Sequence, residues 1–307
     1  MKKYSIDLHC HTNNSDWTKW AEELIKEAKA IWLDFICASD HDILDESFAL
    51  KAEKAGIQSC ESSEISVIWH TNNEAHVIIY SNKINRRIIN ILNKTRQSRV
   101  DILMHKIDRL NDRTIYVDPV ELLAYYWEMW IKPESISLRH LAKFIFSKKR
   151  NATLLKNIFW EEINEDVFVK EFLTEDWESA MVWWRMRCYF LPSIEDLTKN
   201  ITNRDPWHII SLAHPEHTFK NTHELSEKIS FYTDRWVNAI EICSNTPKNW
   251  VHTILKIRKD YDLILTIWSN CHWDLDSSRY GNFWDSNPEI QYHIIHEQFQ
   301  EFKKRIT

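Results

Sequence analysis

Short apolar runs alternate with amphipathic segments in the first 80 residues of the chain. The run YSIDLHCH (4–11) has strand character, and TKWAEELIKEAKAIW (18–32) follows it with apolar residues at helical spacing. Two more strand-like runs come next, LDFICASDHD (33–42) and AHVIIYS (75–81). Strands that alternate with helices predict an α/β fold with a parallel sheet and right-handed crossovers.

The same alternation returns late in the chain, whereas the middle differs. Residues 86–195 are rich in charged helix formers and have few strand-like runs, so we expect them to form a helical insertion or cap. Residues 1–85 and 196–307 would then form the α/β domain. The late elements expected from the pattern are strand-like runs at 209–213, 238–243 and 263–268 and helices at 223–232 and about 247–260.

Composition is that of an ordinary globular protein, with 307 residues, 44% hydrophobic and 27% charged. No apolar run reaches the ~18 residues that a membrane span requires, and we expect a cytoplasmic protein. The six cysteines show no CxxC spacing, which indicates neither a zinc knuckle nor a disulfide framework. The formal charge of −6 argues against a stable complex with nucleic acid.

Residues of the types that bind metals follow the apolar runs. Five separate strand ends present them, and in an α/β fold ligands gather where strands end. Mixed imidazole and carboxylate ligands suit Zn, Mn or Fe, so the pattern predicts a metal site. The candidates are His9, His11, Asp16, Asp40, His41, Asp42, Glu64, His76, His214, Asn270 and His272.

The segments DLHCHTNNSD, ASDHD, AHVIIY, LAHP and SNCH, together with Glu64, resemble the PHP (polymerase and histidinol phosphatase) superfamily in order and separation. The resemblance implies a distorted (β/α)7 TIM-like barrel with a helical insertion. The insertion is similar to that of small bacterial PHP proteins, a group that includes nucleoside bisphosphate phosphatases and a 5′–3′ exoribonuclease.

The resemblance also implies two or three divalent metal ions and a set of roles. His9, His11, Glu64 and residue 270 would hold one ion, Glu64, His76 and His214 a second, and Asp16, His41 and His272 a third. Asp40, His41 and Glu64 would be the catalytic residues, with Asp40 or Asp42 supporting a ligating imidazole. Arg139 and His140 lie where the relatives carry an Arg-x-His pair, with His140 aligned and the arginine displaced by one position, and they would bind the substrate. Asn270 departs from the family, which usually has aspartate there.

The predicted function is hydrolysis of a phosphomonoester, or of a nucleotide or nucleic-acid end, by a metal-activated water. The expected partner is a small phosphorylated substrate, a nucleotide or an oligonucleotide end. Two alternatives stay open: a phosphatase of the histidinol-phosphate type, and a barrel that binds metal or nucleotide without turnover because Asn270 is a weaker ligand.

Glycine and tryptophan have abnormal frequencies. The chain has only 2 glycines but 16 tryptophans, where about 7% glycine is usual. Several tryptophans fall at turns that favour glycine, among them Trp17, Trp32, Trp268, Trp273 and those of EMWIK and DRWVNAIEI. Our hypothesis is that the source reads UGA as glycine and that the printed sequence translates it as tryptophan. The alternative is a chain that is naturally rich in tryptophan.

Overall fold

The computed structural model describes residues 5–15, 19–69, 73–159, 163–173, 190–202, 208–268 and 287–306. The chain divides into two compact units. The first, which we call the sheet unit, comprises residues 1–93 and 191–307, and the second, the insertion unit, comprises 94–190. The sequence predicted an insertion over 86–195.

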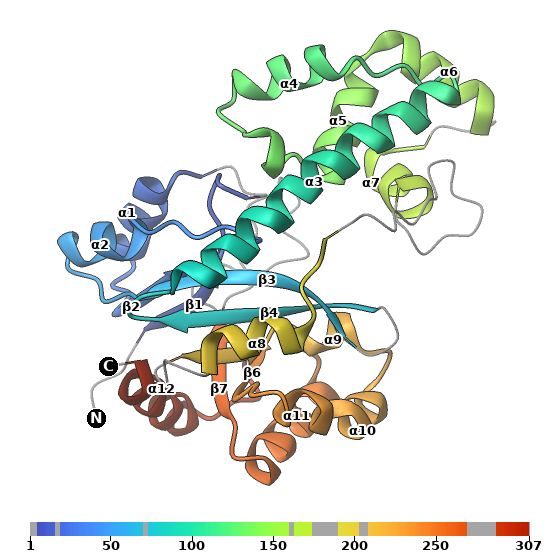
Figure 1. Cartoon of the computed structure of the whole chain (residues 1–307). Helices are drawn as coiled ribbons and strands as arrows, with labels where there is room; N and C mark the ends of the chain where they lie inside the picture. Colours follow the sequence, from blue (N-terminus) through green and yellow to red (C-terminus); the bar gives the residue numbers. More distant parts are fainter. Residues whose placement is uncertain are drawn as a thin grey trace. The chain divides into compact units, whose positions relative to one another are not determined.

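Seven strands are described in the sheet unit (Figure 1). β1 and β2 form a parallel pair, and the other five form a sheet in the order β3-β4-β5-β6-β7. β1 also lies against β7, and β2 lies against β3, so the edges of the two sheets meet. The bounds are β1 Ile6–Cys10, β2 Phe35–Ala38, β3 Glu61–Trp69, β4 Asn73–Ser81, β5 Ile209–Leu212, β6 Ala239–Cys243 and β7 Ile264–Trp268.

One strand, β4, does not have the parallel orientation that the sequence predicted. β4 pairs antiparallel with both β3 and β5, whereas β5, β6 and β7 are mutually parallel. β3 and β4 are joined by residues 70–72 alone, and so short a connection allows a hairpin but no crossover helix. The class is therefore mixed α/β, as expected, but the purely parallel alternation was wrong. Closure into the predicted (β/α)7 barrel stays a prediction.

Helices follow most of the parallel strands, and their apolar faces join the core. In α1 the buried residues are Ala21, Leu24, Ile25 and Ala28, which are three or four apart as one helix face requires. The main core is formed by residues from all seven strands together with residues of α10, α11 and α12. The helices are α1 Ala21–Ala30, α2 Phe48–Lys54, α8 Ile194–Thr202, α9 Pro215–Thr218, α10 Thr222–Thr233, α11 Lys248–Asp260 and α12 Tyr292–Ile306.

The insertion unit is helical and has an apolar core of its own, which includes Leu110, Leu122, Phe144 and Phe168. Its first helix, α3, begins in the sheet unit and continues into the insertion. The described elements are α3 Arg86–Asp112, α4 Pro119–Trp127, η2 Pro133–Ser135, α5 Leu138–Ser147, α6 Lys149–Phe159, α7 Glu165–Phe168 and η3 Val169–Leu173. No helix in the described part of the chain is both long and apolar enough to cross a membrane.

Three tryptophans occupy the backbone conformation that favours glycine. Trp32, Trp130 and Trp236 have φ of 62°, 61° and 69°, and their side chains are 86%, 67% and 65% exposed. Each follows a helix, and the next residue donates its N–H back to the last turn, as Leu33 does to Ala28 O at 2.9 Å. Gly56, with φ of 88°, ends α2 in the same way, because Ile57 donates to Ala52 O at 3.0 Å.

These three positions are among those at which the sequence suggested glycine. Trp17 and Trp273 lie outside the described residues, and Trp268 is the last residue of β7. By contrast, Trp250 lies within α11 and is only 8% exposed, so its ring packs in the core.

Candidate metal centre

A single buried carboxylate lies at the centre of the site. Glu64 is 1% exposed and belongs to β3, where it pairs with Ile78 of β4 and forms a bridge with His41. The sequence analysis counted Glu64 among residues that follow apolar runs, but Glu64 lies inside a strand that starts at Glu61 and continues to Trp69. The apolar residues after Glu64 extend the strand, so the placement of Glu64 at a strand end was wrong.

Three histidines surround one oxygen of Glu64. Oε2 lies 3.2 Å from His9 Nε2, 3.5 Å from His11 Nε2 and 3.0 Å from His41 Nδ1. His9 lies in β1 and His11 follows it, and their Nε2 atoms are 3.1 Å apart. The structure thus brings together His9, His11 and Glu64, three of the four residues expected to hold one ion.

Two further histidines approach the other oxygen. Oε1 lies 2.7 Å from His214 Nε2 and 3.0 Å from His76 Nδ1, and these two nitrogens are 3.3 Å apart. His214 follows β5 at its carboxyl end. His76 lies in the amino half of β4, and because β4 is antiparallel to β5, that half reaches the same edge of the sheet.

The donor set fits a metal ion. Two groups, His9–His11–Glu64 and His41–Glu64–His76, have potential ligand atoms that all lie within 4.8 Å of one another. Imidazole nitrogens and carboxylate oxygens in such a group suit Zn, Mn or Fe better than Mg. Both groups share Glu64, so its two oxygens could bridge two ions.

The buried acids and imidazoles of the cluster shift one another's pKa. Burial opposes protonation of His9, but Glu241 and Glu64 outweigh it and raise the pKa of His9 to about 10. Burial likewise opposes protonation of His76, yet Glu64 and Glu74 raise its pKa to about 10. Burial alone would raise the pKa of Glu64, but the neighbouring histidines hold it well below its usual range. Protons and a bound cation would therefore compete for the imidazole nitrogens of this cluster.

The two aspartates of the ASDHD segment hold the backbone around the cluster. Asp40 accepts hydrogen bonds from Thr12 N (2.6 Å), Thr12 Oγ1 (2.6 Å) and Ser15 Oγ (2.7 Å). Ser15 Oγ is in turn 3.4 Å from His11 Nδ1, which links Asp40 to that imidazole through one hydroxyl. Asp42 accepts from Ser66 N at 3.0 Å. The support that we expected for an imidazole thus passes through Ser15.

Glu241 is a part of the site that the sequence analysis missed. It lies in β6, is fully buried, and its Oε1 is 3.1 Å from His9 Nδ1. A glutamate in the middle of the apolar run AIEIC was the available signal, because an unpaired charge is rarely placed inside a strand core.

The remaining predicted site residues belong to the insertion unit or lie outside the described residues. His140 is in the first turn of α5, where its Nδ1 accepts from Ser137 N at 3.0 Å in a capping box. Arg139 precedes it and is exposed. Both belong to the insertion unit. Asp16, Asn270 and His272 lie outside the described residues.

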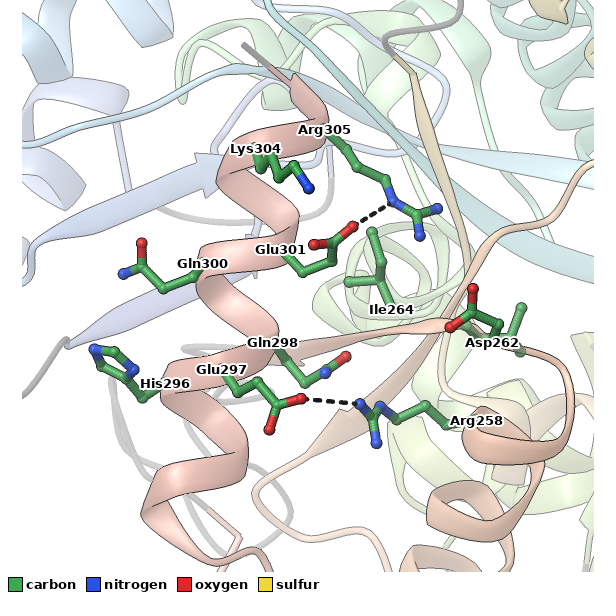
Figure 2. A pocket seen from close by; sticks show the side chains of 11 residues that line it. Arg258, Asp262, Ile264, His296, Glu297, Gln298, Gln300, Glu301, Lys304 and Arg305 are labelled. Atoms are coloured by element: carbon green, nitrogen blue, oxygen red, sulfur yellow. Dashed lines mark hydrogen bonds and ion pairs between the residues drawn. The ribbon is translucent and has the colours of Figure 1, made fainter.

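A cavity of about 640 Å³ lies at the opposite end of the strands (Figure 2). It is lined by α12 and by Arg258, Asp262 and Ile264, which flank the amino end of β7. Arg258 pairs with Glu297 of α12, and Arg305 pairs with Glu301 one turn away on α12 itself, as the dashed lines show. Positive and negative groups are paired there, and the residues of the histidine cluster take no part in it.

Comparison with known proteins yields structural matches only. No protein-family profile and no curated protein matches the chain. A protein from Bifidobacterium adolescentis that is named as a metal-dependent phosphoesterase matches with a TM-score of 0.72 and 18% sequence identity. The match covers 99% of this chain and 97% of that protein. An amidohydrolase from Chromobacterium violaceum, with bound sulfate and no metal, matches with a TM-score of 0.74 and 17% identity over 98% and 96%. The chain therefore shares the fold of these two proteins.

Proposed function

We propose that this chain is a metal-dependent hydrolase of phosphoric esters. The observation that carries the proposal is Glu64, a buried carboxylate with imidazole nitrogens within 3.5 Å on both of its oxygens. Such a carboxylate can bridge two ions, the arrangement used by many phosphatases and nucleases. The motif resemblance and the name of the Bifidobacterium neighbour support the phosphoester class.

When bound, the ions would lower the pKa of a coordinated water toward neutrality and neutralise charge on the phosphoryl oxygens. The chain's own residues would prepare that site. Glu64 and five histidines would supply the ligands: His9, His11, His41, His76 and His214. Asp40 would keep the loop after His11 in place through Thr12 and Ser15. The cluster offers a nucleophile through water and needs no serine or cysteine.

For the substrate we propose a small phosphorylated compound, a nucleotide or the end of an oligonucleotide. The resemblance to small bacterial PHP proteins supports nucleotides, and Arg139 on the insertion is exposed and could contact a phosphate. The net charge of −6 favours a small substrate over an extended nucleic acid.

The test is a turnover screen of protein loaded with Mn or Zn, with metal content measured in parallel. The panel contains nucleotides, short oligonucleotides, histidinol phosphate and simple amides. We expect release of phosphate or mononucleotide, which Glu64→Gln should reduce by at least about 100-fold, since it removes a shared ligand. Glu61→Gln is the matched control, because Glu61 lies on the same strand and accepts Ile84 N. Cleavage of amides alone would contradict the phosphoester assignment.

A barrel that binds metal without turnover is the competing function, and Asn270 is the residue that motivates it. Asn270→Asp restores the aspartate that PHP relatives usually carry. If the non-catalytic alternative holds, the printed chain binds metal but releases no product, and Asn270→Asp gains turnover. Equal metal content and turnover in both proteins would show that residue 270 is not a ligand.

A further inference from the structure

Glu241 is a carboxylate of the site that forms hydrogen bonds with two residues of the cluster, His9 and His214. Its Oε1 and Oε2 lie 3.1 Å and 3.3 Å from His9 Nδ1, and Oε2 also accepts the backbone N–H of His214 at 2.9 Å. Both Glu241 and His9 are fully buried. One side chain on β6 is therefore hydrogen-bonded to residues from β1 and from the end of β5.

The contact with His9 determines which ring nitrogen faces the cluster. His9 Nε2 points toward Glu64 Oε2 (3.2 Å) and His11 Nε2 (3.1 Å), whereas Nδ1 points toward Glu241. A buried carboxylate only accepts hydrogen bonds, so Nδ1 must carry a hydrogen. In a neutral ring the lone pair then lies on Nε2, the atom that a metal ion would need.

The contact with His214 supports a strained backbone. His214 has φ of 26° and ψ of 64°, outside the conformations that side-chain-bearing residues adopt readily, and Pro215 follows it. Such strain persists only where neighbouring groups over-determine it. The carboxylate of Glu241 holds the N–H of this residue and so keeps the His214 ring over Glu64.

We propose that Glu241 is a positioning residue that sets the tautomer of His9 and the backbone of His214, and thereby the metal affinity of both sides of Glu64. The proposal rests on the metal site of the proposed function. Oε1 faces His9 alone, whereas Oε2 lies within hydrogen-bond distance of both partners. Glutamine at this position replaces one of the two oxygens by an NH2 group, which cannot accept from either partner.

The experiment measures Zn²⁺ affinity by competition with a chromophoric chelator for the unaltered chain, Glu241→Gln and Glu61→Gln. We expect a 10- to 100-fold weaker affinity in Glu241→Gln, the usual effect of removing a carboxylate behind a ligating histidine. Glu61→Gln should stay within about threefold, because Glu61 holds a backbone N–H outside the cluster. An affinity in Glu241→Gln equal to that of Glu61→Gln would overturn the proposal.

Nitrogen NMR of histidine-labelled, zinc-loaded protein reports the tautomer of His9 in the unaltered chain. The His9 signal, assigned by its loss in His9→Gln, should show hydrogen on Nδ1 and metal on Nε2. The opposite tautomer would contradict the role of Glu241 even if affinity falls. Failure of the unaltered chain to bind zinc would instead count against the proposed metal site itself.

Discussion

The two ends of the parallel strands differ in what holds their strained residues. At the carboxyl end, Asp42 and His214 have φ of 54° and 26°, and both are tied into the cluster by hydrogen bonds. At the amino end, Trp32, Trp236 and Asp262 have φ of 62°, 69° and 51° in turns that lead from a helix into a strand. The side chains of the two tryptophans are exposed there.

The strained residues at the carboxyl end therefore help to build the site. Those at the amino end have no contact with the site in the described part of the chain. A residue held at positive φ costs about 1–3 kcal/mol and persists where its surroundings impose it. At the carboxyl end, buried carboxylates impose it and place an imidazole on Glu64. At the amino end, only the helix-ending turn imposes it, and Gly56 makes the same turn without a side chain.

The largest expected effect is a difference in pH dependence between metal-free and metal-loaded protein. His9 and His76 have their pKa raised from 6.5 to about 10. A raised pKa contributes stability that is complete below pH 6.5 and is lost as the pH rises toward 10. Urea denaturation in EDTA should therefore show a free energy of unfolding that falls over that window. Saturating Zn should remove the fall, because the ions replace the protons. If the free energy of unfolding of the metal-free protein rises between pH 6.5 and 10, the raised pKa of His9 and His76 is contradicted.

A smaller effect is expected from Asp40→Asn at the carboxyl end. Asp40 accepts three hydrogen bonds from Thr12 and Ser15 in a buried setting, so the amide should cost about 1–3 kcal/mol in the free energy of unfolding. Asp45→Asn is the matched control. Asp45 also accepts a backbone N–H and a hydroxyl, from Ser47, but in an exposed turn. Equal losses in the two variants would show that burial of the Asp40 network adds nothing.

At the amino end, Trp32→Gly and Trp236→Gly should each stabilise the protein. Relief of the left-handed conformation is worth about 1–2 kcal/mol, and the greater freedom of glycine in the unfolded chain offsets about 0.5–1 kcal/mol. Thermal unfolding of each variant measures the gain. Trp250→Ala is the control of opposite sign, since its buried ring should cost about 3–5 kcal/mol. A loss in Trp32→Gly would mean that the exposed indole makes a contact that stabilises the fold.

Peptide masses from the native source test the origin of these residues. If UGA is read as glycine, peptides that cover positions 32, 130 and 236 will have masses that match glycine. Masses that match tryptophan at all three positions would end the hypothesis and leave the alternative of a naturally tryptophan-rich chain.

The smallest effect should come from Asp262→Gly, in the turn that leads into β7. Aspartate tolerates the left-handed conformation better than most residues. The change in the free energy of unfolding should stay within about 0.5 kcal/mol, well below the gain at Trp32. A gain as large as that of Trp32→Gly would show that side-chain size is not the source of the strain.

The sequence alone was sufficient for local features. Apolar spacing predicted six of the seven described strands, all but β3, and the helices α1, α10 and α11, because burial of one face requires that spacing, whatever lies opposite. The sequence also identified His9, His11, His41, Glu64, His76 and His214 as ligand candidates, since residue type is a local property. The tryptophans at helix ends belong with these features, because the left-handed turn after a helix depends on a few neighbouring residues.

Tertiary structure decided everything that depends on pairing between distant segments. The antiparallel setting of β4 brings His76 to the carboxyl edge, and no periodicity within β4 could indicate its direction. Glu241 meets His9 across 232 positions of sequence, so only the juxtaposition of β1 and β6 shows that it belongs to the site. The fold also decides the contacts of His140, whose side chain forms a capping box with Ser137 at the start of α5. The chemistry of a residue follows from its type, but the fold determines which partner it contacts and therefore what role it has.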